Sequence, residues 1–241
     1  MIKFFDKIHK NLLNVVFPAF CNGCSKLLLK NEKIICTQCI HNLPLTHHHL
    51  LKETEIHKVF YGLVPFEFGA SLLYFRKKGI AQHLMHNLKY KNQQEIGTFL
   101  GDIFSKNVID LPVFNDVDGI IPVPLHKKRL HERGYNQVTT FCESLEKNLA
   151  IPIIDDVLIK SKNLKSQIQK SKENRLETNK NVFSIENAHK IEGKHILLVD
   201  DIFTTGATIE ACAKEILKIK KTIKNDLNFW FYPELCGFCN C

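Results

Sequence analysis

The sequence contains no run of about 18 apolar residues, the length that a membrane-spanning helix needs. We therefore predict no transmembrane segment. It also shows no internal repeat and no long low-complexity segment, which argues against a repeat protein. The apolar stretch 12–20 ends on Phe20, directly before Cys21, and lacks the small residues that precede a signal-cleavage site. Together these absences favour a cytoplasmic protein.

The N-terminal stretch has a helical pattern of its own. Ile8, Leu12, Val15 and Val16 are spaced as on one helical face, and lysines occupy other positions. We expect an amphipathic helix that docks on the body of the protein. A role at a membrane surface is the alternative.

What the chain does contain is ordinary for a globular protein, apart from its charge. It has 241 residues, of which 44% are hydrophobic, enough for a small module followed by one larger domain. We place these units at 1–58 and 59–241. The formal net charge is +8, and lysines are spread through several segments. A basic surface attracts polyanions without choosing among them, so nucleic-acid binding is permitted rather than indicated.

The nine cysteines include a pattern typical of a metal site. Two pairs, Cys21 with Cys24 and Cys36 with Cys39, each have two residues between their members, and 11 residues separate the pairs. Two such turns form a tetrahedral four-thiolate site for structural Zn²⁺. A module this small has little core, so the metal would supply much of its folding free energy. Two disulfides are the alternative, which the absence of a secretion signal disfavours.

The remaining histidines and cysteines are interpreted differently. His41 and the histidines at 47–49 lie near the cysteine pairs, but four thiolates already complete a zinc shell. Cys142 and Cys212 fall on apolar helix faces, so we expect buried thiols. A last group is either free thiols on a frayed end or part of a second metal site without an obvious fourth ligand: Cys236, Cys239 and Cys241.

From about Val59 onward, apolar strand and helix patterns alternate along the chain. A strand or hairpin is expected within 66–75, and further strands at 117–121, 157–159, 182–185, 195–199 and 229–232. Helices are expected through 80–88, 96–103, 138–149 and 209–217. This alternation predicts an α/β fold with a mostly parallel sheet.

The most informative segment is 196–208. Its apolar beginning predicts a buried parallel strand that delivers Asp200 and Asp201 to the carboxyl edge of the sheet, where α/β folds bind ligands. A hydroxyl-rich loop then leads into a helix: Thr204, Thr205, Gly206, Ala207 and Thr208. Helix N-termini bind phosphate, and carboxylates accept hydrogen bonds from vicinal sugar hydroxyls. The segment therefore indicates a ribose-5-phosphate site, with Thr208 as the expected N-cap.

Two other interpretations fit the acid pair. It can belong to a purely structural loop. It can also mark a response-regulator receiver, in which a similar run binds Mg²⁺. In a receiver, however, a full domain follows that run, whereas only 40 residues follow Asp201.

Several segments resemble known families. The run from Leu198 to Thr208 resembles the motif that binds 5-phosphoribosyl-1-pyrophosphate (PRPP) in type I phosphoribosyltransferases. The block 120–137, which reads IIPVPLHKKRLHERGYNQ, resembles a signature of the ComF family, bacterial proteins linked to DNA uptake in natural transformation. The block from Ser166 to Phe183 and the cysteine module also resemble ComF. The resemblance covers nearly the whole chain and implies a type I phosphoribosyltransferase-like domain, with helices on both faces of its sheet, behind a zinc-ribbon-like module.

The resemblance also implies roles for the block after the second predicted strand. In type I enzymes the corresponding loop contacts pyrophosphate, which implies this role for Leu125 and His126. Arg129 and Arg133 lie four residues apart on one helical face and suit bidentate phosphate contacts. A solvated basic turn, or a salt bridge to Glu132, is the alternative for these arginines.

Two further segments are candidates for the same cleft. The polar stretch 163–180 has no hydrophobic periodicity and is expected to be a flexible loop that closes over the site. The run 89–91 matches a ComF-like patch that lines the cleft, follows a DNA path, or simply ends a helix.

The sequence offers no nucleobase-recognition element and no evident general base. We therefore expect a ComF-type protein that binds PRPP with Mg²⁺ and, by the resemblance, handles single-stranded DNA, with a DNA-uptake helicase as a candidate partner. Two alternatives stay open. One is an active phosphoribosyltransferase with an unknown acceptor, and the other is a DNA-binding module whose PRPP pocket is vestigial.

Overall fold

The computed structural model describes residues 18–160, 182–219 and 227–235. Three of the expectations above lie outside these ranges: the N-terminal amphipathic helix, the loop at 163–180, and the C-terminal group of Cys236, Cys239 and Cys241. Within the described ranges, no helix combines the length and the apolar character that a membrane span requires.

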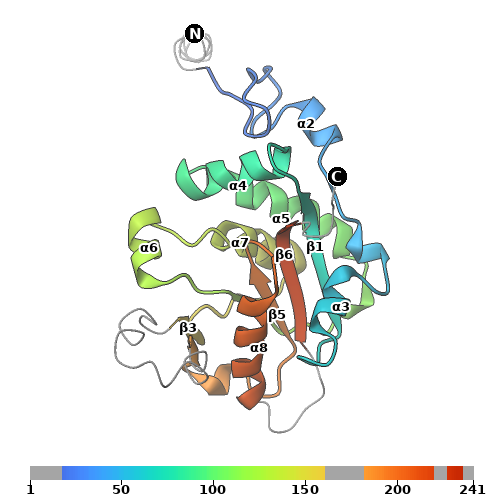
Figure 1. Cartoon of the computed structure of the whole chain (residues 1–241), viewed down its shortest axis with the longest axis vertical. Coiled ribbons are helices and arrows are strands. Elements are labelled where there is room, and N and C mark those ends of the chain that lie inside the picture. Colours follow the sequence, from blue (N-terminus) through green and yellow to red (C-terminus); the bar gives the residue numbers. More distant parts are fainter. Residues whose placement is uncertain (1–17, 161–181, 220–226, 236–241) are drawn as a thin grey trace, which may run out of the picture.

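A four-stranded parallel sheet forms the centre of the molecule (Figure 1). Its strand order is β1-β6-β5-β2, with the bounds β1 Phe68–Phe75, β6 Leu227–Leu235, β5 Ile196–Asp200 and β2 Gly119–Pro122. β6, the last strand in the chain, lies between β1 and β5. Beyond β2, Ile153 forms a parallel bridge to Ile120 and extends the sheet by one more contact. The predicted α/β fold with a parallel sheet is confirmed.

The sequence of β5 explains why this strand is central. Leu197 and Val199 point into one apolar cluster, whereas Ile196 and Leu198 point into another, and all four are fully buried. A strand that is buried on both faces must be apolar at every position, which is typical of parallel sheets covered by helices.

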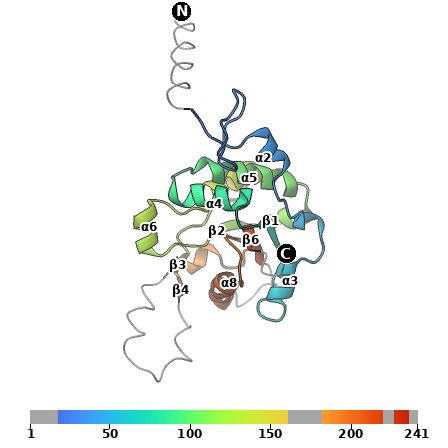
Figure 2. The same ribbon diagram turned by 45° about the horizontal axis from the view of Figure 1, so that its top comes forward.

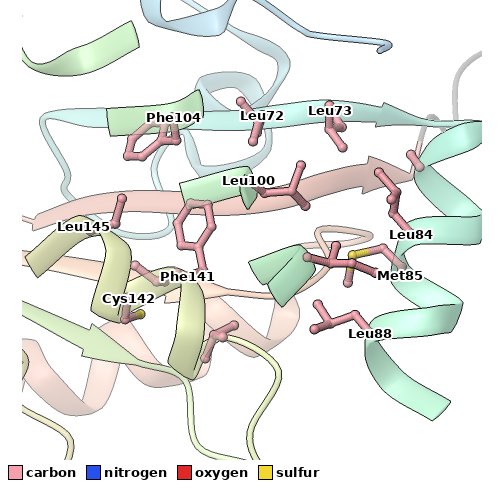
Figure 3. Packing of buried hydrophobic residues seen from close by; sticks show 14 of the residues in the cluster. Leu72, Leu73, Leu84, Met85, Leu88, Leu100, Phe104, Phe141, Cys142 and Leu145 are labelled. Carbon is pink, nitrogen blue, oxygen red and sulfur yellow. The ribbon is translucent and has the colours of Figure 1, made fainter. Parts of the chain in front are cut away.

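Helices cover both faces of the sheet, as predicted (Figure 2). One face packs against α4 Ile80–Tyr90, α5 Glu95–Val108 and α7 Thr139–Leu149. Figure 3 shows this cluster, in which Phe104 and Phe141 lie between β1 and the helices. The other face packs against α3 Glu55–Phe60 and α8 Ala207–Ile219. Cys142 and Cys212 are fully buried, and burial raises the pKa of each thiol, as expected for structural cysteines.

Two predicted strands do not join this sheet. β3 Leu158–Lys160 and β4 Phe183–Ile185 pair with each other in an antiparallel ribbon. The ribbon packs beside α8, and Phe183 belongs to the same apolar cluster as that helix. Short apolar runs do not by themselves reveal which sheet they join.

The N-terminal module leads directly into the sheet domain. It contains α2 Thr37–His41, a short 3₁₀ turn η1 His48–Leu50 and then α3. Leu45 bridges to Leu73, and the Thr46 N–H donates to the Leu72 carbonyl, so the chain around 44–46 lies along the edge of β1. Two further short 3₁₀ turns, η2 Pro112–Phe114 and η4 Ala188–Lys190, precede β2 and β5.

Candidate functional site

The acid pair lies at the carboxyl end of β5, where the chain turns into the loop before α8. Asp200 ends the strand, and the loop from Asp201 to Gly206 follows. A small hollow opens at this edge, and five of the seven residues predicted in the segment 200–208 line it: Asp200, Thr204, Gly206, Ala207 and Thr208. Asp201 and Thr205 flank the hollow rather than line it.

The loop keeps its shape because of Gly206, whose φ of +76° is a conformation that side chains other than glycine rarely adopt. A Cβ atom at this position would lie 2.9 Å from the Phe60 ring and 3.1 Å from the Phe203 ring. The two rings pack against each other at 5.9 Å between centroids, so the loop from Asp201 to Gly206, here called the phosphate-type loop, packs on an aromatic pair. The end of α3 therefore supports the loop from below.

The first turn of α8 faces the hollow. The helix begins at Ala207, so Thr208 already lies inside it, and the prediction that Thr208 is the N-cap was wrong. The Ala207 N–H instead donates to Thr205 Oγ1 at 3.5 Å, and the Glu210 N–H donates to the Gly206 carbonyl at 2.9 Å. Gly206, Ala207 and Thr208 of this turn line the hollow, and the N-terminus of a helix favours a bound anion.

The two carboxylates are in different environments. Asp201 pairs with Lys89 from α4, and the Lys89 Nζ lies 2.7 Å from Asp201 Oδ2. Asp200 accepts a hydrogen bond from the Asp201 N–H at 2.7 Å. Burial, followed by the neighbouring Asp201 charge, raises the pKa of Asp200 to about 7, although this hydrogen bond, Lys89 and Lys160 oppose the rise. One carboxylate is thus neutralised by a lysine, while the other holds a proton near neutral pH.

Lys89 is a site residue whose contact sequence reasoning missed. The sequence placed it in a patch at a helix end, without a partner. An acid pair next to a strand end needs a nearby cation, but the sequence does not say which of many lysines supplies it.

The loop after β2 lies beside the acid pair. The Val123 N–H donates to the Val199 carbonyl at 2.8 Å, so this loop continues along β5 toward its carboxyl end. His126 is the N-cap of α6 Lys127–Arg133, and its Nδ1 accepts a hydrogen bond from the Lys128 N–H at 3.1 Å. Its Nε2 is buried and has no hydrogen-bond partner among the described residues. Asn136 ties the loop back, because its Nδ2 donates to the Val123 carbonyl at 3.0 Å.

Arg129 and Arg133 do not line the hollow. Both line a groove of about 610 Å³ between the end of α4 and α6. The residues that line this groove are Lys89, Tyr90, Asn92, Arg129, Glu132, Arg133 and Tyr135. Lys89 is the residue that connects the groove to the acid pair. The predicted contact of the arginines with pyrophosphate stays a prediction.

The four cysteines of the N-terminal module lie together. Within the described chain, the sulfur atoms of Cys21, Cys24, Cys36 and Cys39 are all within 4.8 Å of one another, and no histidine joins the group. Cys24 Sγ and Cys36 Sγ are 3.7 Å apart. Tetrahedral sulfur ligands at about 2.3 Å from a zinc ion would be separated by roughly 3.8 Å, so the spacing fits a metal ion.

One thiol of the module, that of Cys21, favours the ionised form, whereas the pKa values of Cys24 and Cys39 are raised. Burial raises the pKa of Cys21, but backbone N–H groups, among them those of Cys36 and Gly23, outweigh burial and lower the pKa to about 7. The Cys36 N–H lies 3.2 Å from the Cys21 sulfur, and the Gly23 N–H lies 3.3 Å from it. Backbone donors to sulfur stabilise the ionised form that metals bind.

Helix α4 anchors this module. His83 Nδ1 donates to the Gly23 carbonyl at 2.8 Å. Asn87 Nδ2 donates to the Asn22 carbonyl at 3.2 Å and to Asn22 Oδ1 at 3.0 Å. Since His83 and Asn87 are four residues apart, one face of α4 holds the first cysteine turn, and Lys89 follows two residues later.

Comparison with known proteins agrees with this architecture. Residues 139–222 match the family model of the phosphoribosyl transferase domain, a range that includes α7, the β3–β4 ribbon, β5 and α8. The matched region contains the acid pair and the hollow.

Three relatives cover much of the chain. DNA utilization protein YhgH of Shigella flexneri is 27% identical over 82% of this chain and 84% of its own length. Competence protein ComFC of Bacillus subtilis is 27% identical over 82% of this chain and 78% of its own length. Competence protein F of Haemophilus influenzae is 30% identical over 56% of this chain and 61% of its own length. With a phosphoribosyltransferase-type domain behind a four-cysteine module, the chain and these relatives together support the resemblance to the ComF family.

Proposed function

We propose that this protein binds a phosphoribosyl ligand, PRPP with Mg²⁺, at the carboxyl end of β5, and that it acts in DNA uptake by handling single-stranded DNA. The observation that carries the ligand proposal is the position of Asp200 beside a hollow at the N-terminus of α8. A sugar phosphate needs hydroxyl acceptors and an anion site a few ångströms apart, and this edge of the sheet supplies both kinds of group.

In this proposal each part of PRPP has its own partners. Asp200 and Asp201 accept hydrogen bonds from the ribose hydroxyls. The 5-phosphate enters the hollow, where backbone N–H groups and the hydroxyls of Thr204, Thr205 and Thr208 are available. The pyrophosphate extends toward Lys89 and the loop of Leu125 and His126. The buried Nε2 of His126 is suited to donate to a phosphate oxygen.

Magnesium would accompany the pyrophosphate. Hard oxygen ligands from carboxylates and phosphates are what Mg²⁺ prefers, and it usually keeps several waters. Asp200 must lose its proton to take part, so its raised pKa makes binding sensitive to pH near neutrality.

For the four-cysteine module we propose structural Zn²⁺. Four thiolates without histidine or carboxylate form a closed shell with no open position for a substrate. The metal would hold the chain of the module in the shape that packs on α4.

The role in DNA uptake rests on the relatives. Two of those compared are named competence proteins, and another is named a DNA utilization protein. The formal charge of +8 is compatible with a polyanionic partner.

Calorimetric titration of Mg²⁺-PRPP tests the ligand proposal. Asp200→Asn and Asp201→Asn should each weaken binding at least tenfold, because each removes a charged acceptor that accounts for about 1.5–3 kcal/mol. Asp110→Asn is the matched control, since Asp110 is exposed at the end of α5. Equal affinity in all variants would refute the site, whereas pyrophosphate release with added bases or amines would identify an active transferase.

A further inference from the structure

Apart from Lys89, the groove between α4 and α6 has no role in the proposed phosphoribosyl site. Both helices lie on the same side of the molecule in the two ribbon views (Figures 1 and 2). Its volume of about 610 Å³ falls in the range of pockets that hold small organic ligands, roughly 300–1,000 Å³. The lining combines aromatic rings with cations, which points to a planar, anionic ligand.

Tyr90 is the residue of the groove that most needs an explanation. It is the last residue of α4, and 67% of its surface is exposed. Its ring nevertheless has two ordered neighbours: the Arg133 guanidinium carbon lies 5.4 Å from the ring centroid, and the His86 ring lies 5.2 Å from it. An exposed tyrosine whose ring contacts a guanidinium and a tilted imidazole is an ordered surface on which a base can stack.

The walls of the groove are fixed to each other. The Tyr135 hydroxyl donates to the Leu88 carbonyl, which joins the segment after α6 to the last turn of α4. Gly134, with a φ of +78°, ends α6, and its N–H donates to the Leu130 carbonyl at 2.7 Å. The Tyr90–Arg133 stack is therefore held by a helix cap and a hydrogen bond rather than by chance proximity.

The charges of the groove favour an anion. Among the described residues, neither Arg129 nor Arg133 has a carboxylate within ion-pair distance. Glu132 is the acidic residue of the lining, and it faces Lys128 with 3.8 Å between Nζ and Oε1. None of the residues of α6 is buried, so this basic helix contributes nothing to the core that would explain its charges.

We propose that this groove binds a nucleotide unit, with its base stacked on Tyr90 and its phosphate on Arg129 and Arg133. Nucleobases stack on tyrosine and arginine whatever their identity, and guanidinium groups bind phosphate in a bidentate manner. The unit comes either from a free nucleotide or from a single-stranded nucleic acid. Since Lys89 borders both sites, the base lies beside the proposed ribose position. The inference rests on the DNA-handling part of the proposed function, but not on PRPP binding.

Fluorescence anisotropy with a labelled twelve-nucleotide oligo-dT strand measures this binding on the full chain. Tyr90→Ala should weaken binding by about fivefold or more, since stacking on one aromatic ring stabilises a base by roughly 1–3 kcal/mol. Tyr90→Phe keeps the ring and should bind nearly as the wild type does. Tyr61→Ala is the matched control, because Tyr61 is 89% exposed and lies outside the groove, at the end of α3.

Salt dependence tests the phosphate contacts. Arg129→Ala should lower the slope of log affinity against log salt by about 0.7, the value for one phosphate contact on a single strand. Arg76→Ala, an exposed arginine outside the groove, should leave the slope unchanged.

Competition with thymidine monophosphate distinguishes the two sources. Displacement of the oligonucleotide by equal nucleotide concentrations identifies a free nucleotide as a sufficient ligand, and failure to displace it identifies a single strand. Both outcomes support the groove, provided that Tyr90→Ala weakens the binding.

The result that overturns the inference is binding of oligonucleotide and mononucleotide by Tyr90→Ala as strongly as by wild type, or no binding by the wild type. A loss of PRPP affinity in Arg129→Ala and Arg133→Ala with unchanged oligonucleotide binding also overturns it, and assigns the arginines to pyrophosphate. The pair Asp200→Asn and Asp201→Asn separates the two proposals, because these variants should lose PRPP while keeping the oligonucleotide.

Discussion

Lys89 and Asp201 form an ion pair, 2.7 Å between Nζ and Oδ2, that joins the last turn of α4 to the loop after β5. Their side chains are only 14% and 19% exposed, so the pair is screened less than a surface pair. Lys89 offsets the repulsion between two neighbouring carboxylates and keeps the pKa of Asp200 lower than burial alone would set it. The cation thus belongs to the acid pair as much as the strand does.

Removing this cation should weaken the site without changing its acceptors. We expect Lys89→Met to reduce Mg²⁺-PRPP affinity at pH 7 about tenfold or more, because a charge-assisted contact of about 1.5–3 kcal/mol is lost and Asp200 retains its proton to higher pH. Lys91→Met, two residues later and exposed, is the control. Isothermal titration would contradict this role for Lys89 if both variants bound as the wild type does.

Binding of Mg²⁺-PRPP should depend on pH near neutrality. The pKa of Asp200 is raised to about 7, and the ionised form is the one that accepts sugar hydroxyls and attracts magnesium. Affinity should therefore rise with pH and level off above about 7, and below it should fall up to tenfold per unit. In Asp200→Asn this dependence should disappear, and a profile that persists in that variant would assign it to another group.

The same carboxyl group should affect stability with the opposite sign. Its pKa is higher in the folded protein than the value of about 3.9 in an unfolded chain, so the folded state binds the proton more tightly. This contribution to stability is fully present below about 4 and is lost as the pH rises through about 7. Denaturant unfolding at several pH values, with Asp200→Asn as reference, measures it.

Two glycines with nearly equal backbone angles allow a sharp test of the phosphate-type loop. Gly206→Ala should combine the strain of a positive φ, about 1–2 kcal/mol, with a clash against the Phe60 ring at 2.9 Å. Gly62→Ala should show the strain alone, since its φ is +72° and no atom lies within 4 Å of the added Cβ. We expect a lower Tm for both variants, a clearly larger loss for Gly206→Ala, and weaker PRPP binding only for Gly206→Ala. Equal losses in both would mean that the aromatic support is not rigid.

Metal removal should destabilise the sheet domain as well as the cysteine module. Cys21, Cys36 and Cys39 belong to the same buried cluster as Leu84 and Leu88 of α4, so a loosened module exposes part of the domain core. Chelation should lower the Tm, elemental analysis should return one zinc per chain before it, and added Zn²⁺ should restore the melting curve. A Tm that does not respond to chelation would indicate that the thiols hold no structural metal.

Local features of this protein were predictable from its sequence, whereas contacts between distant segments were not. The β5 strand, the acid pair and the start of α8 follow one another along the chain, so the apolar run and its polar end predict their arrangement. The cysteine spacing likewise predicts the cluster that the structure shows. By contrast, Lys89 meets Asp201 only because α4 packs on the sheet that contains β5.

The ribbon of β3 and β4 and the position of β6 show the same limit. Leu158 and Phe183 have the pattern of ordinary buried strand residues, yet Leu158 pairs with Ile185 and Phe183 with Lys160, and neither strand pairs with the central sheet. Thr208 resembled an N-cap in the sequence, but the helix begins at Ala207, where the small Gly206 allows the turn. Sequence periodicity predicts that an element exists, and tertiary packing decides its neighbours and its ends.

Helix α4 touches the first cysteine turn through His83 and Asn87 and touches the acid pair through Lys89. The proposed zinc site and the proposed sugar-phosphate site therefore both contact the same helix of eleven residues. Thermodynamic reciprocity then requires that if zinc strengthens the binding of the sugar phosphate, the sugar phosphate strengthens the binding of zinc by the same free energy. With such coupling, zinc limitation would lower the affinity for the sugar phosphate at the other end of the helix.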